Sequence, residues 1–187
     1  FELIKCEWFT LEESQSKIEN KLDEVEPDII VIQLITNDVK TDNAENIATK
    51  VQTLVNKILE KSNTKIYVCT GLPRKDTCDN NLRIKLTNVI LCEKLTSAKI
   101  INVSQYFEEN GKMKESLFRD DVHPNEDASK ILAGTIKSNI RKNSNPSEPG
   151  NQNVVPQSGH QHRPRSQSRR WGKGARPRSI GRSYDRS

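Results

Sequence analysis

The apolar positions of this 187-residue chain follow two different spacings. In some segments they recur every three or four residues, which marks one face of an amphipathic helix. The helices predicted in this way are residues 11–25, 44–61, 80–95 and 127–140. Shorter apolar stretches, mostly rich in Ile and Val, precede or separate these helices and indicate strands. The predicted strands are residues 1–5, 28–34, 65–69 and 99–103.

The alternation of strands and helices predicts the fold class. Chains of this kind form a parallel sheet with helices packed on its faces. The run Asp28-Ile-Ile-Val-Ile-Gln-Leu34 is nearly all apolar, as expected for a strand that is covered on both faces. We therefore expect an α/β fold, a three-layer α/β/α sandwich on a parallel sheet. Residues 106–114 are predicted to be irregular, with a turn at Asn110-Gly111.

Polar residues indicate where the helices begin and end. Thr10 and Glu13 form a capping box at the start of the first helix, and Pro27 ends it. Asp42 and Glu45 form a second capping box before the helix at 44–61. For the third helix, the spacing predicts four core-facing residues. These are Leu82, Leu86, Val89 and Ile90.

The charges divide the chain into a domain and a tail. Residues 141–187 hold 11 Lys and Arg against 2 Asp and Glu, a net charge of +9. Residues 1–140 hold 19 against 23, a net charge of −4. The segment 141–187 is also rich in Ser, Asn, Pro and Gly and has no apolar periodicity, which predicts a disordered tail. Its basic character indicates a polyanionic partner.

The cysteines and the hydropathy restrict the other classes of function. No Cys-x-x-Cys spacing occurs, so we expect no metal site, and nothing in the sequence indicates a cofactor. Cys69 and Cys92 lie in apolar stretches and are expected to be reduced core residues, which favours an intracellular protein, cytoplasmic or nuclear. No apolar run approaches the roughly 20 residues of a membrane-spanning helix, and no signal peptide is evident.

The stretch Leu117-Phe-Arg-Asp-Asp-Val-His-Pro-Asn125 contains the residues with the clearest chemistry. Asp120 precedes His123 by three residues. Pro124 prevents a helix from running through His123, and Asn125 is expected to cap the helix that follows. A carboxylate and an imidazole held together on a loop are typical of the orienter and base of a nucleophilic hydrolase. The alternative is a surface turn with a solvated histidine.

Asn37 is the second candidate. In open α/β sheets, ligands bind beyond the carboxyl ends of the strands. Three segments are predicted to lie there: residues 35–39, residues 70–74 and the segment leading to His123. The amide of Asn37 could donate to an oxyanion that develops during acyl transfer. The alternative for Asn37 and Asp38 is a simple Asx turn.

Two of these stretches resemble conserved blocks of the SGNH (GDSL-type) hydrolases. Residues 28–38 resemble the third block, and residues 118–125 resemble the last. The resemblance covers roughly residues 1–140 and implies a flavodoxin-like sheet. It also implies that His123 is the general base, that Asp120 orients it and that Asn37 lies in the oxyanion hole. The implied substrate is a small ester or acetyl group, hydrolysed through an acyl-enzyme.

Two departures from the family pattern bear on activity. Ile35 stands where the family has Gly, and the Gly-Asp-Ser block that carries the nucleophile is absent. Ser14 and Ser16 fall inside a predicted helix, and Ser104 follows a strand too late in the chain order. We nominate none of them as a nucleophile. The first, central strand of the family is also missing, so we expect the sequence to be truncated just after the nucleophile loop.

The tail offers a separate function. It interleaves arginines with aromatic residues, a composition that binds phosphates and stacks on bases. The candidate nucleic-acid contacts are Arg169, Arg170, Trp171, Arg176 and Arg178. Two hypotheses therefore remain open. The first is an SGNH-type esterase with a basic tail, which is inactive as given. The second is a non-catalytic domain, derived in one version from a retroelement, whose tail binds RNA or DNA. A plain solvated linker is the alternative for the tail. The sequence does not specify the substrate or the oligomeric state.

Overall fold

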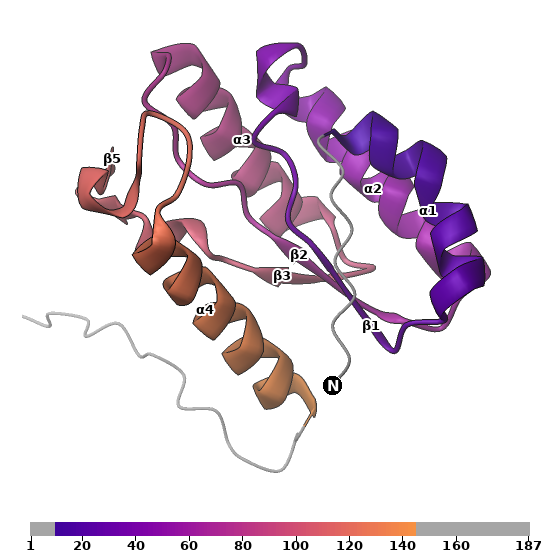
Figure 1. The fold of residues 1–187 in the computed structure, drawn as a ribbon. Coiled ribbons are helices and arrows are strands. Elements are labelled where there is room, and N and C mark those ends of the chain that lie inside the picture. The colour runs from indigo at the N-terminus through magenta and orange to yellow at the C-terminus, as the bar shows by residue number, and fades with distance from the viewer. Residues whose placement is uncertain (1–9, 145–187) are drawn as a thin grey trace, which may run out of the picture. The chain divides into compact units, whose positions relative to one another are not determined.

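A computed structural model describes residues 10–144 and shows a parallel sheet of three strands (Figure 1). The strands are β1 (Ile29–Ile32), β2 (Lys65–Cys69) and β3 (Lys99–Ile101), in the order β1-β2-β3. In the register, Ile29 lies opposite Lys65, and Cys69 lies opposite Ile101. The α/β class with a parallel sheet is therefore confirmed. The predicted strand at 1–5 lies outside the described residues.

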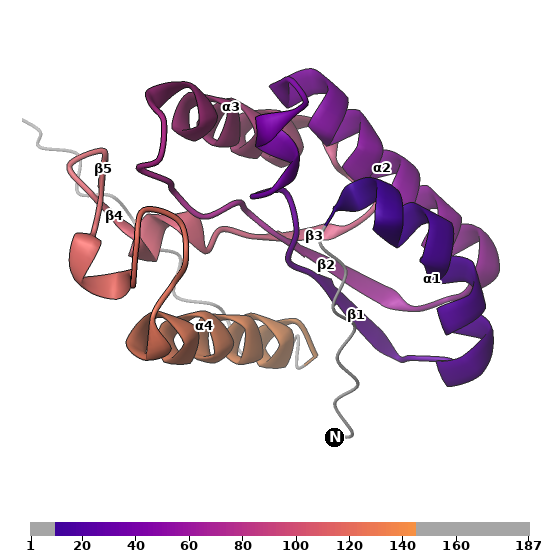
Figure 2. The same cartoon turned by 45° about the horizontal axis from the view of Figure 1, so that its top comes forward.

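The long helices cover both faces of the sheet. They are α1 (Leu11–Val25), α2 (Ala44–Lys61), α3 (Cys78–Lys94) and α4 (Glu126–Ser144). Helices α1, α2 and α3 lie on one face and α4 on the other, which gives three layers (Figure 2). Alternate strand residues serve the two faces: Ile66 and Val68 belong to the core under α1–α3, whereas Tyr67 and Cys69 belong to the core under α4.

Short elements fill the connection between β3 and α4. They are the 3₁₀ turn η2 (Ser104–Tyr106), the strands β4 (Glu108–Glu109) and β5 (Lys112–Met113), and the 3₁₀ turn η3 (Glu115–Leu117). β4 and β5 pair antiparallel around Asn110 and Gly111, whose φ angles are 51° and 75°. The predicted turn is confirmed, because these two residue types tolerate positive φ. The rest of 106–114 is a small hairpin rather than irregular chain.

The predicted starts of α1 and α2, at residues 11 and 44, are confirmed, but the predicted capping box before α2 is wrong. The Thr10 hydroxyl accepts from the Glu13 N–H at 3.2 Å, as expected for an N-cap. At α2 the N-cap is Asn43, whose side chain accepts from the Asn46 N–H at 2.8 Å. Asp42 lies one residue earlier and instead pairs with Lys50 at 2.7 Å.

The predicted core face of α3 is wrong for three of its four residues, whereas the fourth, Ile90, is partly buried against the core. Leu82, Leu86 and Val89 are 55%, 49% and 53% exposed. The buried residues are Ile84, Thr87 and Leu91, and Cys92 is exposed rather than in the core. The helix carries two apolar stripes, so periodicity alone could not choose between them. The Thr87 hydroxyl donates to the Arg83 carbonyl at 2.8 Å, which allows a polar residue on the buried side.

Two further boundaries differ from prediction. β1 is shorter than the predicted 28–34 strand, and only Ile32 in it is buried. Among residues 10–144, β1 has a hydrogen-bonded neighbour on one side only, so its burial is incomplete. α4 continues to Ser144, past the expected end of the domain at 140. In the part of the chain that the structure describes, no helix is long and apolar enough to cross a membrane.

Candidate active site

Three loops meet beyond the carboxyl ends of the strands. The first follows β1 and includes the 3₁₀ turn η1 (Asp38–Lys40), which starts directly after Asn37. The second runs from β2 to α3 and contains Arg74 and Lys75. The third joins η3 to α4 and contains His123. The second loop bonds to both others: Arg74 donates to the Thr36 carbonyl, and the Lys75 N–H donates to the Asp121 carbonyl at 2.8 Å.

Asp120 and His123 are in direct contact on the third loop. The ring Nδ1 of His123 lies 2.8 Å from Oδ2 and 3.0 Å from Oδ1 of Asp120. The backbone N–H groups of Val122 and His123 also donate to Oδ1, at 2.9 and 2.8 Å. These bonds, above all the one from the His123 N–H, hold the pKa of Asp120 at about 2. Asp120 is therefore an acceptor at neutral pH, and Nδ1 must carry the proton.

The other ring nitrogen of His123, Nε2, has no hydrogen bond to any residue in the range 10–144. Within residues 10–144, Asp120 is the only hydrogen-bond partner of the His123 ring. The His123 side chain is 63% exposed, so a reacting group can approach it. A neutral imidazole with Nδ1 held by a carboxylate can take a proton at Nε2 and return it later.

The His123 loop is held by its own backbone and by Asn125. The Arg119 N–H donates to the His123 carbonyl at 2.8 Å, which closes the turn around Asp120. Asn125 caps α4 as predicted, since its Oδ1 accepts from the Ala128 N–H at 3.0 Å. Its amide nitrogen donates to the Ser116 carbonyl at 2.7 Å. The pair is thus pre-organised by local bonds although its side chains are exposed.

The Asn37 loop contains a strained residue. Ile35 has a φ of 89° and is buried. Positive φ is easy for glycine but unfavourable for a β-branched residue. Ile35 stands where the SGNH pattern has Gly, a residue for which this φ carries no steric penalty. The Ile35 Cγ2 lies 3.2 Å from where a Cβ on Gly71 would be, so the glycine in the second loop leaves room for it.

Asp38 has a structural role beside Asn37. It is 3% exposed, and its Oδ1 accepts from the Leu11 N–H at the start of α1 at 3.0 Å. Burial raises its pKa above the ordinary value. Asn37 itself is exposed at the start of η1. The Asn-Asp pair therefore presents one side chain to solvent and uses the other to join the loop to α1.

The three serines considered in the sequence, Ser14, Ser16 and Ser104, are hydrogen-bonded to residues other than His123. Ser14 and Ser16 donate to backbone carbonyls of α1 and its cap, both at 2.8 Å. The Ser104 hydroxyl donates to Asn102 at 3.0 Å. None of them is hydrogen-bonded to His123, which supports leaving the nucleophile unassigned.

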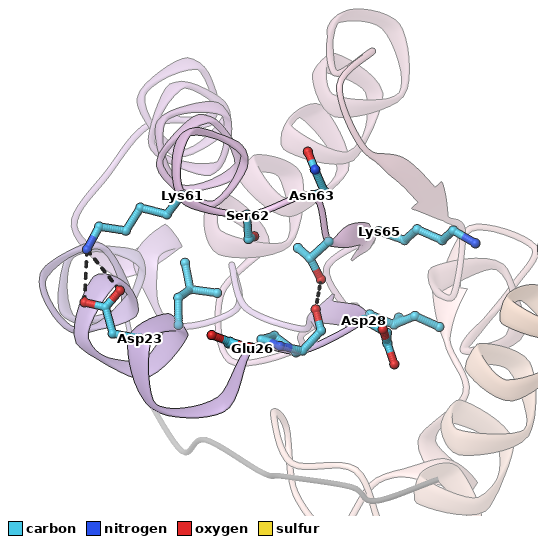
Figure 3. Close-up of a pocket in the computed structure, with 11 residues that line it drawn as sticks. Asp23, Glu26, Asp28, Lys61, Ser62, Asn63 and Lys65 are labelled. Carbon is cyan, nitrogen blue, oxygen red and sulfur yellow. Dashed lines mark hydrogen bonds and ion pairs between the residues drawn. The ribbon is translucent and has the colours of Figure 1, made fainter.

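A pocket lies far from these loops. It has a volume of about 610 Å³ and surrounds the amino ends of β1 and β2, at the opposite edge of the sheet (Figure 3). Lys61 and Asp23 form an ion pair of 3.2 Å there, and the Thr64 hydroxyl donates to the Pro27 carbonyl. No group of three potential metal ligands occurs among residues 10–144. The pocket therefore adds nothing to the site around His123.

The structure also reveals residues that the sequence did not identify. Arg74, in the second loop, is 2% exposed, and its side chain bonds to Thr36 of the first loop and to Asp76. A basic residue directly after Gly-Leu-Pro was the only signal in the sequence. The tail residues proposed to contact nucleic acid lie outside the described residues, so that interpretation stays a prediction.

Comparison with known proteins gives a fold but no close relative. No protein-family model matches the sequence, and no curated protein matches it. A GDSL-like lipase from Bacteroides thetaiotaomicron has a similar structure, with a TM-score of 0.64 and 20% identity over 72% of each chain. A carbohydrate esterase family 3 protein from Talaromyces cellulolyticus has a TM-score of 0.60 and 20% identity, over 72% of this chain and 67% of that one.

A third similar structure is an acetylxylan esterase from Geobacillus stearothermophilus. Its TM-score is 0.54 at 16% identity, over 70% of this chain and 67% of that chain. At such identities the likeness concerns the fold. With the parallel sheet, the helices on both faces and the loops at its carboxyl edge, these matches show that the chain has the SGNH (GDSL-type) hydrolase fold.

Proposed function

We propose that this domain serves the hydrolysis of a small ester or acetyl group by a Ser-His-Asp mechanism. The observation that carries the proposal is the Asp120–His123 pair, with its 2.8 Å bond at Nδ1 and, among residues 10–144, no hydrogen bond at Nε2. Neighbouring folds that are described as lipases and acetylxylan esterases support an ester substrate. The serine nucleophile would be supplied by a longer parent protein, and the chain as given would be inactive.

Each residue has one task in this reaction. His123 Nε2 takes the proton of the serine hydroxyl as the oxygen attacks the ester carbonyl carbon, and Asp120 stabilises the resulting imidazolium. Asn37 donates to the oxyanion of the tetrahedral intermediate. His123 then gives the proton to the departing alcohol, which leaves an acyl-enzyme. A water molecule repeats the sequence and releases the acid, with no need of a metal or cofactor.

A second candidate function is a non-catalytic domain with a nucleic-acid-binding tail. Two observations favour it: the strained Ile35 beside Asn37, and the net charge of +9 on residues 141–187. Deletion of residues 145–187, which leaves α4 intact, should then abolish salt-sensitive binding to RNA. Unchanged RNA binding by the shortened protein would contradict the role of the tail.

The enzyme proposal is tested with p-nitrophenyl acetate. The chain as given should show no hydrolysis above background, and His123→Ala should behave identically. A protein extended by its natural upstream sequence should hydrolyse the ester, and His123→Ala should reduce its kcat by a factor of about 10³ or more. His160→Ala in the tail is the matched control and should keep full activity. An extended protein without turnover would contradict the proposal.

A further inference from the structure

Arg74 is an unusual residue for its position. Its side chain is 1% exposed, yet it carries a full charge in a loop. The guanidinium makes a forked pair with Asp76, from Nε at 2.9 Å and from Nη2 at 2.6 Å. The bond from Arg74 lowers the pKa of Asp76 to about 2, so the pair is ionised at neutral pH. A buried charge persists where it is paired and fully bonded.

The remaining arm of the fork points to the neighbouring loop. Nη1 of Arg74 donates to the carbonyl of Thr36, the residue directly before Asn37. The next backbone group in the same loop, the Lys75 N–H, donates to the Asp121 carbonyl in the His123 loop at 2.8 Å. Two consecutive residues therefore hold the two loops that carry Asn37 and His123.

We propose that Arg74 is a positioning residue that fixes the Thr36–Asn37 peptide, and with it the oxyanion donor, relative to His123. The inference rests on the role proposed for Asn37. The loop needs such a restraint because Ile35 holds an unfavourable backbone conformation two residues before Asn37. A peptide next to a strained residue can relax into another conformation when its carbonyl is released. Nη1 of Arg74 holds the Thr36 carbonyl in a site that excludes most water, where a charge-assisted hydrogen bond is strong.

The test is amide hydrogen exchange in Arg74→Lys, which keeps the charge but loses the fork. Two amides report on the Asn37 loop: Asp38, which donates to the Ile35 carbonyl at 3.0 Å, and Thr41, which donates to the Asp38 carbonyl at 3.1 Å. Their exchange should become faster by about tenfold or more, because a local opening is favoured. Core amides in α2 should exchange as in the unmodified protein.

Arg83→Lys is the matched control. Arg83 also donates to a carbonyl of this loop, that of Val39 at 3.0 Å, and also pairs with a carboxylate, Asp79, at 3.1 Å. Its side chain is 35% exposed, so water can replace its bonds, and loop exchange should change by less than about threefold. If Arg74→Lys does not fold, Asp76→Asn is the second variant. It keeps Arg74 but weakens the ion pair that holds the guanidinium, so exchange at Asp38 and Thr41 should again become faster, by a smaller factor.

Two results would overturn the inference. Unchanged exchange at Asp38 and Thr41 in Arg74→Lys would show that the bond from Arg74 to the Thr36 carbonyl does not hold the loop. An equal increase in the loop and in α2 would show a general role in stability without positioning. Neither result depends on turnover. An extended protein that lacks esterase activity would contradict the proposed function and leave the exchange result standing.

Discussion

Replacement of Ile35 by Gly and by Ala separates backbone strain from packing. Ile35 is 1% exposed, so either change removes a fully buried side chain. Such a loss costs about 2–5 kcal/mol of unfolding free energy. The two variants differ in the backbone, because Ile35 has a φ of 89°. Alanine retains a Cβ that is disfavoured there by about 1–2 kcal/mol, whereas glycine does not.

Glycine also makes the unfolded chain more flexible, which costs about 0.4–1 kcal/mol. The difference leaves Ile35→Gly more stable than Ile35→Ala by up to about 1.6 kcal/mol, with a central value of about 0.8 kcal/mol. This order is the reverse of the usual one, in which alanine is favoured over glycine. Both variants should be less stable than the original chain, because restored backbone freedom does not replace the lost packing.

Urea unfolding, followed by circular dichroism, measures the difference. About 1 kcal/mol corresponds to a shift of roughly 0.3–1 M in the midpoint at the usual slopes. Ile32 is the matched control, because it is 5% exposed in β1 and its φ is not positive. There Ala should be the more stable replacement. If Ile35→Ala were clearly more stable than Ile35→Gly, the backbone strain beside Asn37 would be refuted.

Four further predictions test other parts of the structure. In His123→Ala the pKa of Asp120, about 2 in the original protein, should rise but stay below its usual range, since the N–H groups of Val122 and residue 123 still donate. Carboxyl ¹³C titration measures this pKa. An unchanged value would contradict the bond from the His123 side chain. Because that pKa is lowered by folding, the contribution of Asp120 to stability should be complete above about pH 4 and be lost as the pH falls towards 2. Leu86→Ser, on the exposed stripe of α3, should change the free energy of unfolding by less than about 1 kcal/mol, whereas Leu91→Ala should lower it by about 2–5 kcal/mol. Thermal or urea unfolding measures both, and equal costs would contradict the orientation of α3. Asn43→Ala should cost about 1 kcal/mol as the loss of an N-cap, and Asp42→Ala less, because its ion pair with Lys50 is partly exposed.

The long helices and the strands of the parallel sheet could be predicted from the sequence, because their apolar residues are spaced or clustered in a characteristic way. The short β-branched stretch at 65–69 and the long stripe of α2 permit one interpretation each. The face of α3 could not be predicted, since both of its stripes are apolar and the choice depends on what packs against it. The burial of β1 likewise depends on a neighbouring strand and not on its own residues.

The site was predicted where its partners are close in sequence. Asp120 and His123 are three residues apart, and their bond follows from a local turn. Arg74 was not recognised, because its contact with Thr36 joins positions 38 apart. The strain at Ile35 was anticipated only as a departure from a family pattern. Its φ and its burial depend on how the loop packs against Gly71, which no local pattern encodes.

The state of the His123 ring tests the central claim most directly. If Asp120 orients His123 as a base, the neutral ring must carry its proton on Nδ1 and leave Nε2 unprotonated. Ring ¹⁵N NMR above the titration range distinguishes the two tautomers, and His123→Ala assigns the signals against His160 and His162. The account predicts a protonated Nδ1 bonded to Asp120, and Asp120→Asn should remove this preference. A ring with its proton on Nε2 in the unmodified protein would contradict the account.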